Sequence, residues 1–154
     1  MEYRIRQVES SVIIRDLDEL LAQSKLEGFR FVQRLVDEYI EGHNRFDRPG
    51  ESLYACYADS RIVGICGVNR VSAGDGIRVG RVRRFYVLPA FRRLGVGRKL
   101  MQALLADAAG TFDVLQLRTD SIPADRFYRS LGFTKDDDHE EVTHSIRILN
   151  NRIL

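Results

Sequence analysis

The stretch from Arg81 to Gly110 constrains the fold more than any other part of this chain, because its pattern changes sharply along its length. Residues 82–88 favour a β-strand, and Pro89 ends that strand. A helical pattern follows, with apolar residues one turn apart: Val96, Leu100, Leu104 and Ala108. Gly110 stands where a helix commonly ends. The sequence therefore predicts a strand, a glycine loop and a helix, in that order.

The glycine loop lies at the predicted start of this helix, with Gly95 and Gly97 separated by one residue. The first N–H groups of a helix have no partner within it, and the helix dipole places partial positive charge there. Glycines let a phosphate approach the backbone closely, so the loop predicts an anion site. The spacing fits neither the Walker A motif nor the dinucleotide fingerprint, because no further glycine or lysine stands where those motifs need one. A surface turn carrying solvated arginines is the alternative.

Two segments of the chain resemble the GNAT superfamily of N-acyltransferases. Arg92, Gly95 and Gly97 match the pattern Gln/Arg-x-x-Gly-x-Gly/Ala of that family's acyl-CoA-binding loop. Downstream, the segment ADRFYRSLGF, residues 124–133, is similar to the family's A-x-x-F-Y-x-x-x-G-F segment. The resemblance implies an acetyltransferase that takes acetyl-CoA as its acyl donor.

The resemblance also implies which residues hold the cofactor. The glycine loop would bind the pyrophosphate, the strand before it would bind pantetheine through its backbone, and Ser121 occupies a position where relatives often carry asparagine. The implied cofactor-binding residues are Phe85, Tyr86, Val87, Arg92, Arg93, Leu94, Gly95, Val96, Gly97, Arg98 and Ser121.

For catalysis, the resemblance places Tyr128 at the usual position of the general acid that protonates the departing thiolate. Packing against Phe127 is the alternative role for this side chain. A neutral amine is needed for attack, and an alkylammonium has a pKa near ~10, so a base or a water chain must remove a proton. Where many relatives carry a glutamate base, this chain has Arg81. The substitutes that remain are a water relay or one of three side chains: Glu51, Asp120 and His43.

The order of predicted elements gives an α/β (α+β) fold with a mixed sheet of six or seven strands, helices on both faces, and splayed central parallel strands as in GNAT proteins. The predicted strands are Tyr3–Val12, Leu53–Ala58, Arg61–Val71, Val82–Leu88, Asp113–Thr119 and Val142–Leu149. The predicted helices are one with a capping box at Asp16 and Glu19, then Phe29–Ile40, Val96–Ala109, and one from Pro123 to before Gly132.

Composition limits the other classes of protein. A chain of 154 residues fits one domain, so residues 1–154 are expected to form a single GNAT-like unit. No apolar run suits a membrane span or a signal core, which predicts a cytoplasmic protein. The hairpin places Cys56 opposite residue 64 rather than Cys66, and no Cys/His cluster suggests a metal.

Three functions remain open. The first is transfer of an acetyl group from acetyl-CoA to the primary amine of a small molecule or peptide. The second is a non-catalytic acyl-CoA sensor or partner module, because the strand glutamate is missing. A nucleic-acid-binding domain is the third, although a net charge of +2 and few interleaved aromatics argue against it. Acids between Asp136 and Glu141 hint at a cationic acceptor, and analogy suggests a homodimer.

Overall fold

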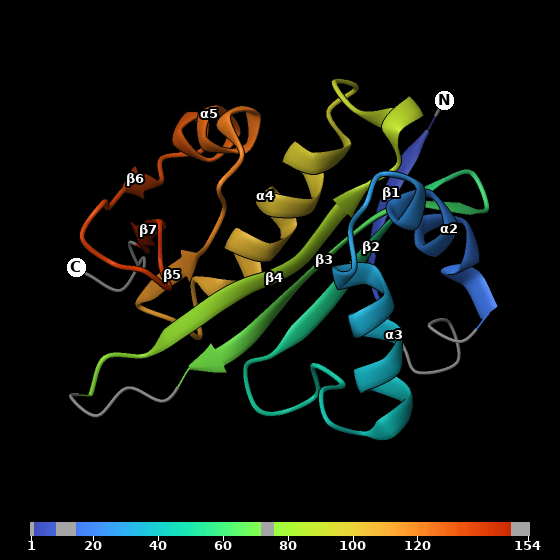
Figure 1. Ribbon diagram of the computed structural model, residues 1–154. Coiled ribbons are helices and arrows are strands. Elements are labelled where there is room, and N and C mark those ends of the chain that lie inside the picture. The colour runs from blue at the N-terminus through green and yellow to red at the C-terminus, as the bar shows by residue number, and fades with distance from the viewer. Residues whose placement is uncertain (1, 9–14, 72–75, 149–154) are drawn as a thin grey trace.

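The computed structural model describes residues 2–8, 15–71 and 76–148. A mixed seven-stranded sheet runs through it, with strand order β1-β2-β3-β4-β5-β7-β6 (Figure 1). The strands are β1 Tyr3–Gln7, β2 Ser52–Ala58, β3 Arg61–Val71, β4 Val79–Val87, β5 Val114–Leu117, β6 Thr134–Lys135 and β7 His144–Arg147. The helices are α2 Asp18–Leu26, α3 Phe31–Glu41, α4 Val96–Ala108 and α5 Ile122–Ser130, with a 3-10 turn, η1, at Pro89–Phe91.

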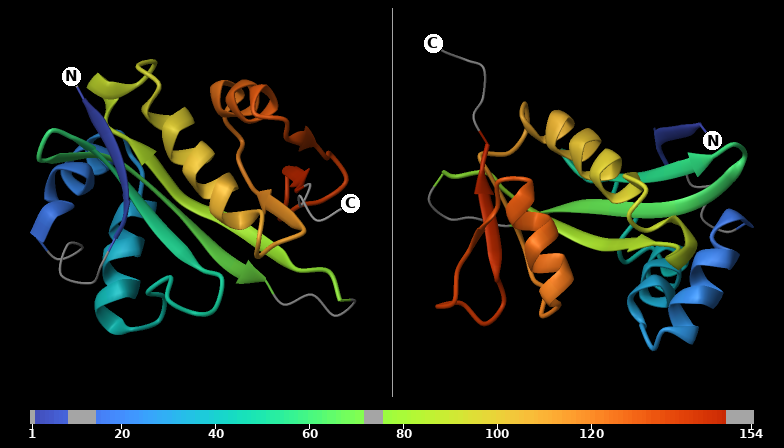
Figure 2. Two further views of the ribbon diagram at one scale, coloured as in Figure 1. Left: turned by 180° about the vertical axis from the view of Figure 1, so that it is seen from behind. Right: turned by 90° about the horizontal axis from the view of Figure 1, so that it is seen from above.

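Strand pairing is antiparallel everywhere except between β4 and β5. Helix α4 connects these two strands, so they form the predicted βαβ unit. Helix α4 covers one face of the sheet, and α2 and α3 cover the other (Figure 2). The mixed sheet with helices on both faces, predicted from the sequence, is confirmed.

The core forms where the apolar stripe of α4 meets β2, β3 and β4. Its periodic residues Val96, Leu100 and Leu104 are at most 1% exposed. Gly64 on β3 allows this close approach, since a Cβ there would lie 3.0 Å from Leu100. Cys56 pairs with Gly64 across the hairpin, as predicted, and both cysteines are free and buried.

Several predicted boundaries are wrong. The capping box at Asp16 does not form, because α2 begins at Asp18 without a side-chain cap and Glu19 instead binds Arg61 of β3. The end of α4 is by contrast confirmed to within one residue, because the helix ends at Ala108 and Gly110 follows its cap residue Ala109, with a φ outside the left-handed region. The last strand is shorter than predicted, and helix α3 begins at Phe31 rather than Phe29. Residues 9–12 of the predicted first strand, 72–75 of a predicted turn, and residue 149 lie outside the described ranges.

A β-bulge interrupts β4 where it runs beside β3. The pairing steps from Ile65–Tyr86 to Gly67–Arg83, which leaves two residues of β4 opposite one of β3. Arg84, in the bulge, has a φ of 59°, a left-handed conformation that costs a residue with a Cβ about 1 kcal/mol. On either side of the bulge, different residues face α4: Gly80 and Val82 before it, then Phe85 and Val87 after it.

Candidate active site

The parallel pair β4–β5 separates partway along its length. Pairing covers only Val79–Val114, Gly80–Leu115 and Arg81–Gln116, although β4 continues to Val87. Beyond Arg81, β4 therefore has no strand partner on its β5 side within the described part of the chain. This confirms the predicted splaying of the central strands. It leaves backbone groups of the predicted pantetheine-binding residues, Phe85 to Val87, facing the gap.

The start of α4 points its free amides toward the same end of β4. Gly95 precedes the helix in a left-handed conformation, with a φ of 87°, and its carbonyl accepts the first helical hydrogen bond from Lys99. No side chain caps this end. A Cβ on Gly95 would have no heavy atom within 4 Å beyond its chain neighbours, so the space in front of it is open. Such an end binds anions through N–H groups and the helix dipole.

The structure gives a reason for the glycine at position 97 that differs from the one the sequence suggests. A Cβ at this position would lie 3.1 Å from the ring of Phe85 and 3.5 Å from that of Phe127. The absence of a side chain therefore lets the first turn of α4 pack against β4 and α5. The two rings meet edge to face at 5.7 Å, which joins the three elements around the predicted cofactor site.

Arg92, the first residue of the loop motif, is already engaged by protein groups. Its two terminal nitrogens each lie 2.7 Å from a carboxylate oxygen of Glu27, and its Nε donates to the carbonyl of Val87 at 3.0 Å. Tyr86 completes the cluster, with its hydroxyl 2.5 Å from Glu27 and its ring under the guanidinium. Arg92 thus fixes the loop to α2 and to the end of β4. Glu27 had no sequence signal, because the contact is tertiary.

Four further predicted cofactor residues fall into two groups: two are exposed on the loop, and two form hydrogen bonds with residues of α5. Arg93, at a left-handed φ of 65°, and Leu94 are exposed on the loop. Arg98 donates to Ser130 of α5 at 2.8 Å, which ties the two helices together. Ser121 caps α5 by accepting from the N–H of Ala124.

Tyr128 lies on the side of the gap that α5 covers. It is 7% exposed and packs against the rings of Phe85, Phe127 and Phe133. Burial, with a contribution from Cys66, raises the pKa of its hydroxyl well above the ordinary value. A phenol in this setting stays protonated at neutral pH, and the raised pKa makes it a weaker acid than an ordinary tyrosine.

The three side chains considered as general bases each lie within ion-pair distance of another side chain. Glu51 is buried, and although burial alone would raise its pKa, hydrogen bonds from Arg48 and the N–H of Arg70 leave the pKa lowered. Asp120 is exposed beside Arg118, and His43 is exposed beside Glu41. None of these groups lies on β4, where the sequence places Arg81.

His144 is a residue whose setting the sequence did not indicate. It is buried on β7, and its Nε2 lies 2.7 Å from Asp125 Oδ1 on α5. Its ring stands 6.0 Å from that of Tyr128. Arg129 and then His144 hold the pKa of Asp125 at about 2. The pair anchors α5 to β7 and so fixes the backbone that carries Tyr128.

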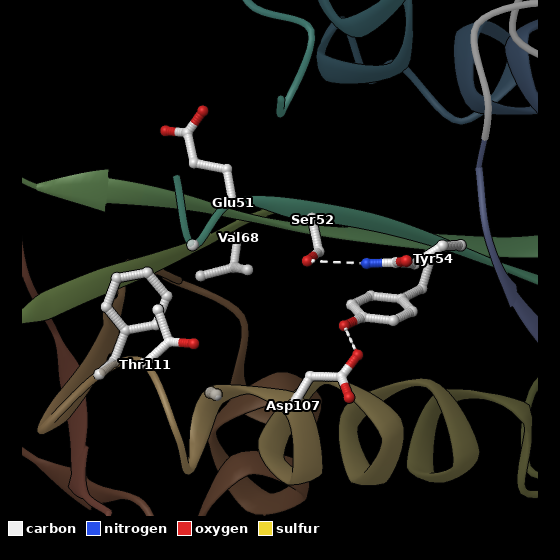
Figure 3. Close-up of a pocket in the computed structure, with 10 residues that line it drawn as sticks. Glu51, Ser52, Tyr54, Val68, Asp107 and Thr111 are labelled. Carbon is white, nitrogen blue, oxygen red and sulfur yellow. Dashed lines mark hydrogen bonds between the residues drawn. The ribbon is translucent and has the colours of Figure 1, made fainter. Parts of the chain in front are cut away.

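A half-open cavity of about 190 Å³ lies elsewhere, at the C-terminal end of α4 (Figure 3). Tyr54 bonds Asp107 there, and Gln7 donates to Ser52 at 3.1 Å. Because the predicted anion site is at the opposite end of α4, this cavity is not part of the candidate active site. Across residues 2–8, 15–71 and 76–148, no cluster of His, Cys, Asp and Glu could hold a metal ion. No helix in those ranges is long and apolar enough to cross a membrane.

Comparison with known proteins identifies the family. Residues 49–135 match the model of the acetyltransferase (GNAT) domain. An uncharacterized protein of Mycobacterium leprae is 33% identical over 111 residues, 66% of this chain and 31% of the relative. The N-alpha-acetyltransferase RimI of Mycobacterium tuberculosis is 33% identical over 94 residues, 58% of this chain and 59% of RimI. The chain thus spans about a third of one curated relative and three-fifths of the other.

Solved structures agree with the sequence match. A proposed acetyltransferase from Exiguobacterium sp. 255-15 is 30% identical, with a TM-score of 0.78 over 96% of this chain and 94% of that one. The family model covers more than half of the chain, including the strand, the glycine loop and the helix described above. This chain belongs to the GNAT superfamily of acetyltransferases.

Proposed function

We propose that this protein is an N-acetyltransferase that uses acetyl-CoA to acetylate a primary amine. The observation that carries the proposal is the convergence of two features at one place. The unpaired edge of β4 beyond Arg81 and the uncapped start of α4 face the same gap, and the contact between Phe85 and Gly97 joins them.

The residues present fit acyl-CoA. Diphosphate oxygens would accept from the free amides at the start of α4, and Gly95 leaves open space for them. Amide groups of pantetheine would pair with the free edge of β4 as an added strand does. Arg93 and Lys99 would add positive charge around the phosphates, while Arg92 would act mainly by fixing the loop through Glu27.

The reaction needs a bond exchange at the thioester carbon. The ammonium first loses a proton to water. The neutral nitrogen then forms a C–N bond as the C–S bond breaks, its second proton passes to water, and the thiolate gains a proton from Tyr128, which is reprotonated from solvent. A donor from the β4 backbone would stabilise the oxyanion. The phenol is protonated at neutral pH and so carries the proton that this role needs, and its place beside Phe85 of β4 supports the assignment. A water chain is the proposed base, since the candidate carboxylates and histidine are bound by other groups.

A non-catalytic acyl-CoA-binding module is the second candidate. The observation that favours it is the absence of a carboxylate along β4, where Arg81, Arg83 and Arg84 stand. Such a module would bind CoA through the same gap without turnover.

One assay separates these functions. The protein is incubated with acetyl-CoA and a broad panel of amines, including peptides with a free N-terminus because RimI is an N-alpha-acetyltransferase, and free thiol is followed over time. Amine-dependent thiol release supports the enzyme. CoA binding by calorimetry without release across the panel supports the module, and no CoA binding contradicts both.

We take the chain as a single catalytic unit acting in the cytoplasm on a small-molecule or peptide amine. A homodimer is proposed by analogy with other proteins of similar fold.

A further inference from the structure

Three arginines of β4 lie on the face of the sheet that α3 covers. Arg81 pairs with Asn69, and Arg83 pairs with Gly67. Asn69 and Gly67 contact Asn44 and Phe46 of the loop before β2, which fixes this face as the one away from α4. The bulge brings Arg84 to the same face, where it reaches Glu38 of α3 at 2.8 Å.

These arginines stand at the point where the sheet opens. Arg81 forms the last β4–β5 pair, with Gln116, and Gln116 in turn pairs with Ser145 of β7. Asn69, Arg81, Gln116 and Ser145 therefore form a polar row across four strands. Arg83 and Arg84 follow along the unpaired part of β4, between this row and the residues proposed to bind the thioester arm.

Carboxylates do not balance this positive charge. Arg84 is paired with Glu38, yet its Nε is buried with no hydrogen-bond partner in the described ranges. Arg81 donates to a neutral group, the carbonyl of Glu141, at 2.6 Å. Arg83 is exposed, and no hydrogen bond or ion pair of its side chain is recorded among the described residues. Although Arg83 is exposed along its side chain, the protein atoms around its guanidinium withdraw it partly from water, and this desolvation, with the charges of Arg81 and Arg84, lowers its pKa, while Glu38 and Glu51 oppose that effect.

The turn between α2 and α3 carries further positive charge on this side of the sheet. It forms an open hollow of about 570 Å³, whose lining includes three basic side chains and no acid: Lys25, Arg30 and Arg34. Next to it, Phe29 and Phe31 pack against Tyr86 of β4. This side of the sheet therefore gathers basic side chains, and the acids nearest Arg83, Glu38 and Glu51, are already paired with Arg84 and Arg48.

We propose that the acetyl acceptor carries an anionic group, a carboxylate or a phosphate, and that Arg83 binds it with Arg81 beside it. Guanidinium groups bind both anions through paired N–H donors. This inference rests on the proposed acetyl transfer, and it reverses the cationic acceptor that the acids of residues 136–141 suggest. Those acids lie on the loop that contributes the Glu141 carbonyl to Arg81.

The test uses amines in pairs with and without the anion, and rates are expressed per concentration of neutral amine because the amine pKa also differs within each pair. Glycine is compared with glycinamide, and phosphoethanolamine with ethanolamine, each by thiol release with acetyl-CoA. The anionic member of at least one pair is expected to have a kcat/KM at least tenfold higher, and the pair that responds identifies carboxylate or phosphate. Arg83→Gln should lower that ratio at least tenfold, whereas Arg83→Lys should retain part of it. Equal rates within both pairs would overturn the inference.

A binding measurement separates this inference from the proposed function. Calorimetry with CoA present measures the affinity of glycine and phosphoethanolamine for the wild type, for Arg83→Gln and for the control Arg61→Gln, a surface arginine paired with Glu19. Loss of anion binding in Arg83→Gln alone supports the site, even if no amine releases thiol and the enzymatic proposal fails. Anion binding unchanged by Arg83→Gln, or no binding of either anion, contradicts it.

Discussion

Glu27 and Arg92 face each other with two parallel hydrogen bonds, each 2.7 Å long, which join helix α2 to the loop before α4. Such bidentate pairs fix orientation as well as distance. The position of the loop that carries the proposed diphosphate site therefore depends on a carboxylate far away in the sequence.

Glu27→Gln should lower the free energy of unfolding by about 1 kcal/mol, because both partners are partly solvated and screening limits the gain from the pair. It should also weaken CoA binding, since the loop loses its anchor. Urea denaturation and calorimetry measure the two effects. Glu19→Gln is the matched control on the same helix, because Glu19 pairs with Arg61 away from the loop. Equal loss of CoA affinity in both variants would contradict the anchoring role.

Gly95→Ala should weaken CoA binding more than tenfold. The substitution imposes a left-handed strain of about 1 kcal/mol and places a methyl group in the open space before the free amides. Gly76→Ala provides the control, because Gly76 has a similar φ of 81° and similar open surroundings away from α4. Both variants should lose similar stability in thermal melts, and only Gly95→Ala should lose affinity. Parallel loss of affinity in the two would exclude a specific site.

Tyr128→Phe should reduce kcat at least tenfold and leave CoA affinity within twofold, because general acids typically contribute about 10²-fold or more. Stability should change little, since the ring keeps its aromatic contacts. Steady-state kinetics and calorimetry measure the effects, with Tyr57→Phe on β2 as control. Full activity in Tyr128→Phe would show that another group protonates the thiolate.

The Asp125 carboxylate should make the free energy of unfolding depend on pH below about pH 4. Its carboxylate is held by Arg129 and His144, so its pKa falls from 3.8 to about 2. A folded-state pKa below the unfolded value means that the stabilisation is present above about pH 4 and is lost as the pH falls toward 2. Asp125→Asn should remove this part of the pH dependence. Denaturation curves between pH 5 and 2 measure it, and an unchanged slope in the variant would contradict the assignment.

The sequence predicts the parts of this fold that repeat along the chain. The stripe of Val96, Leu100 and Leu104 and the hairpin that places Cys56 opposite Gly64 both follow from local periods, and both are confirmed. Contacts between distant segments had no such signal. Glu19 binds Arg61 instead of capping its own helix, and His144 is buried because Asp125 on α5 reaches it.

The candidate site divides in the same way. The glycine motif marks the start of α4, but only packing shows that Gly97 makes room for Phe85 whereas Gly95 provides the turn. The role of Arg92 likewise depends on Glu27, which approaches from α2. Motif positions therefore locate this site, and tertiary contacts assign the physical role of each residue.

The bulge at Arg84 shifts the alternation of side chains between the two faces of β4 by one residue. Before it, even-numbered side chains of β4 point to α4, and after it odd-numbered ones do, so Arg83 and Arg84 come out together on the opposite side. Deleting a single residue there would exchange the surroundings of Phe85 and Tyr86. One inserted residue thus lets a continuous strand present different side chains to its two sides, where we propose the acyl donor and the acceptor to bind.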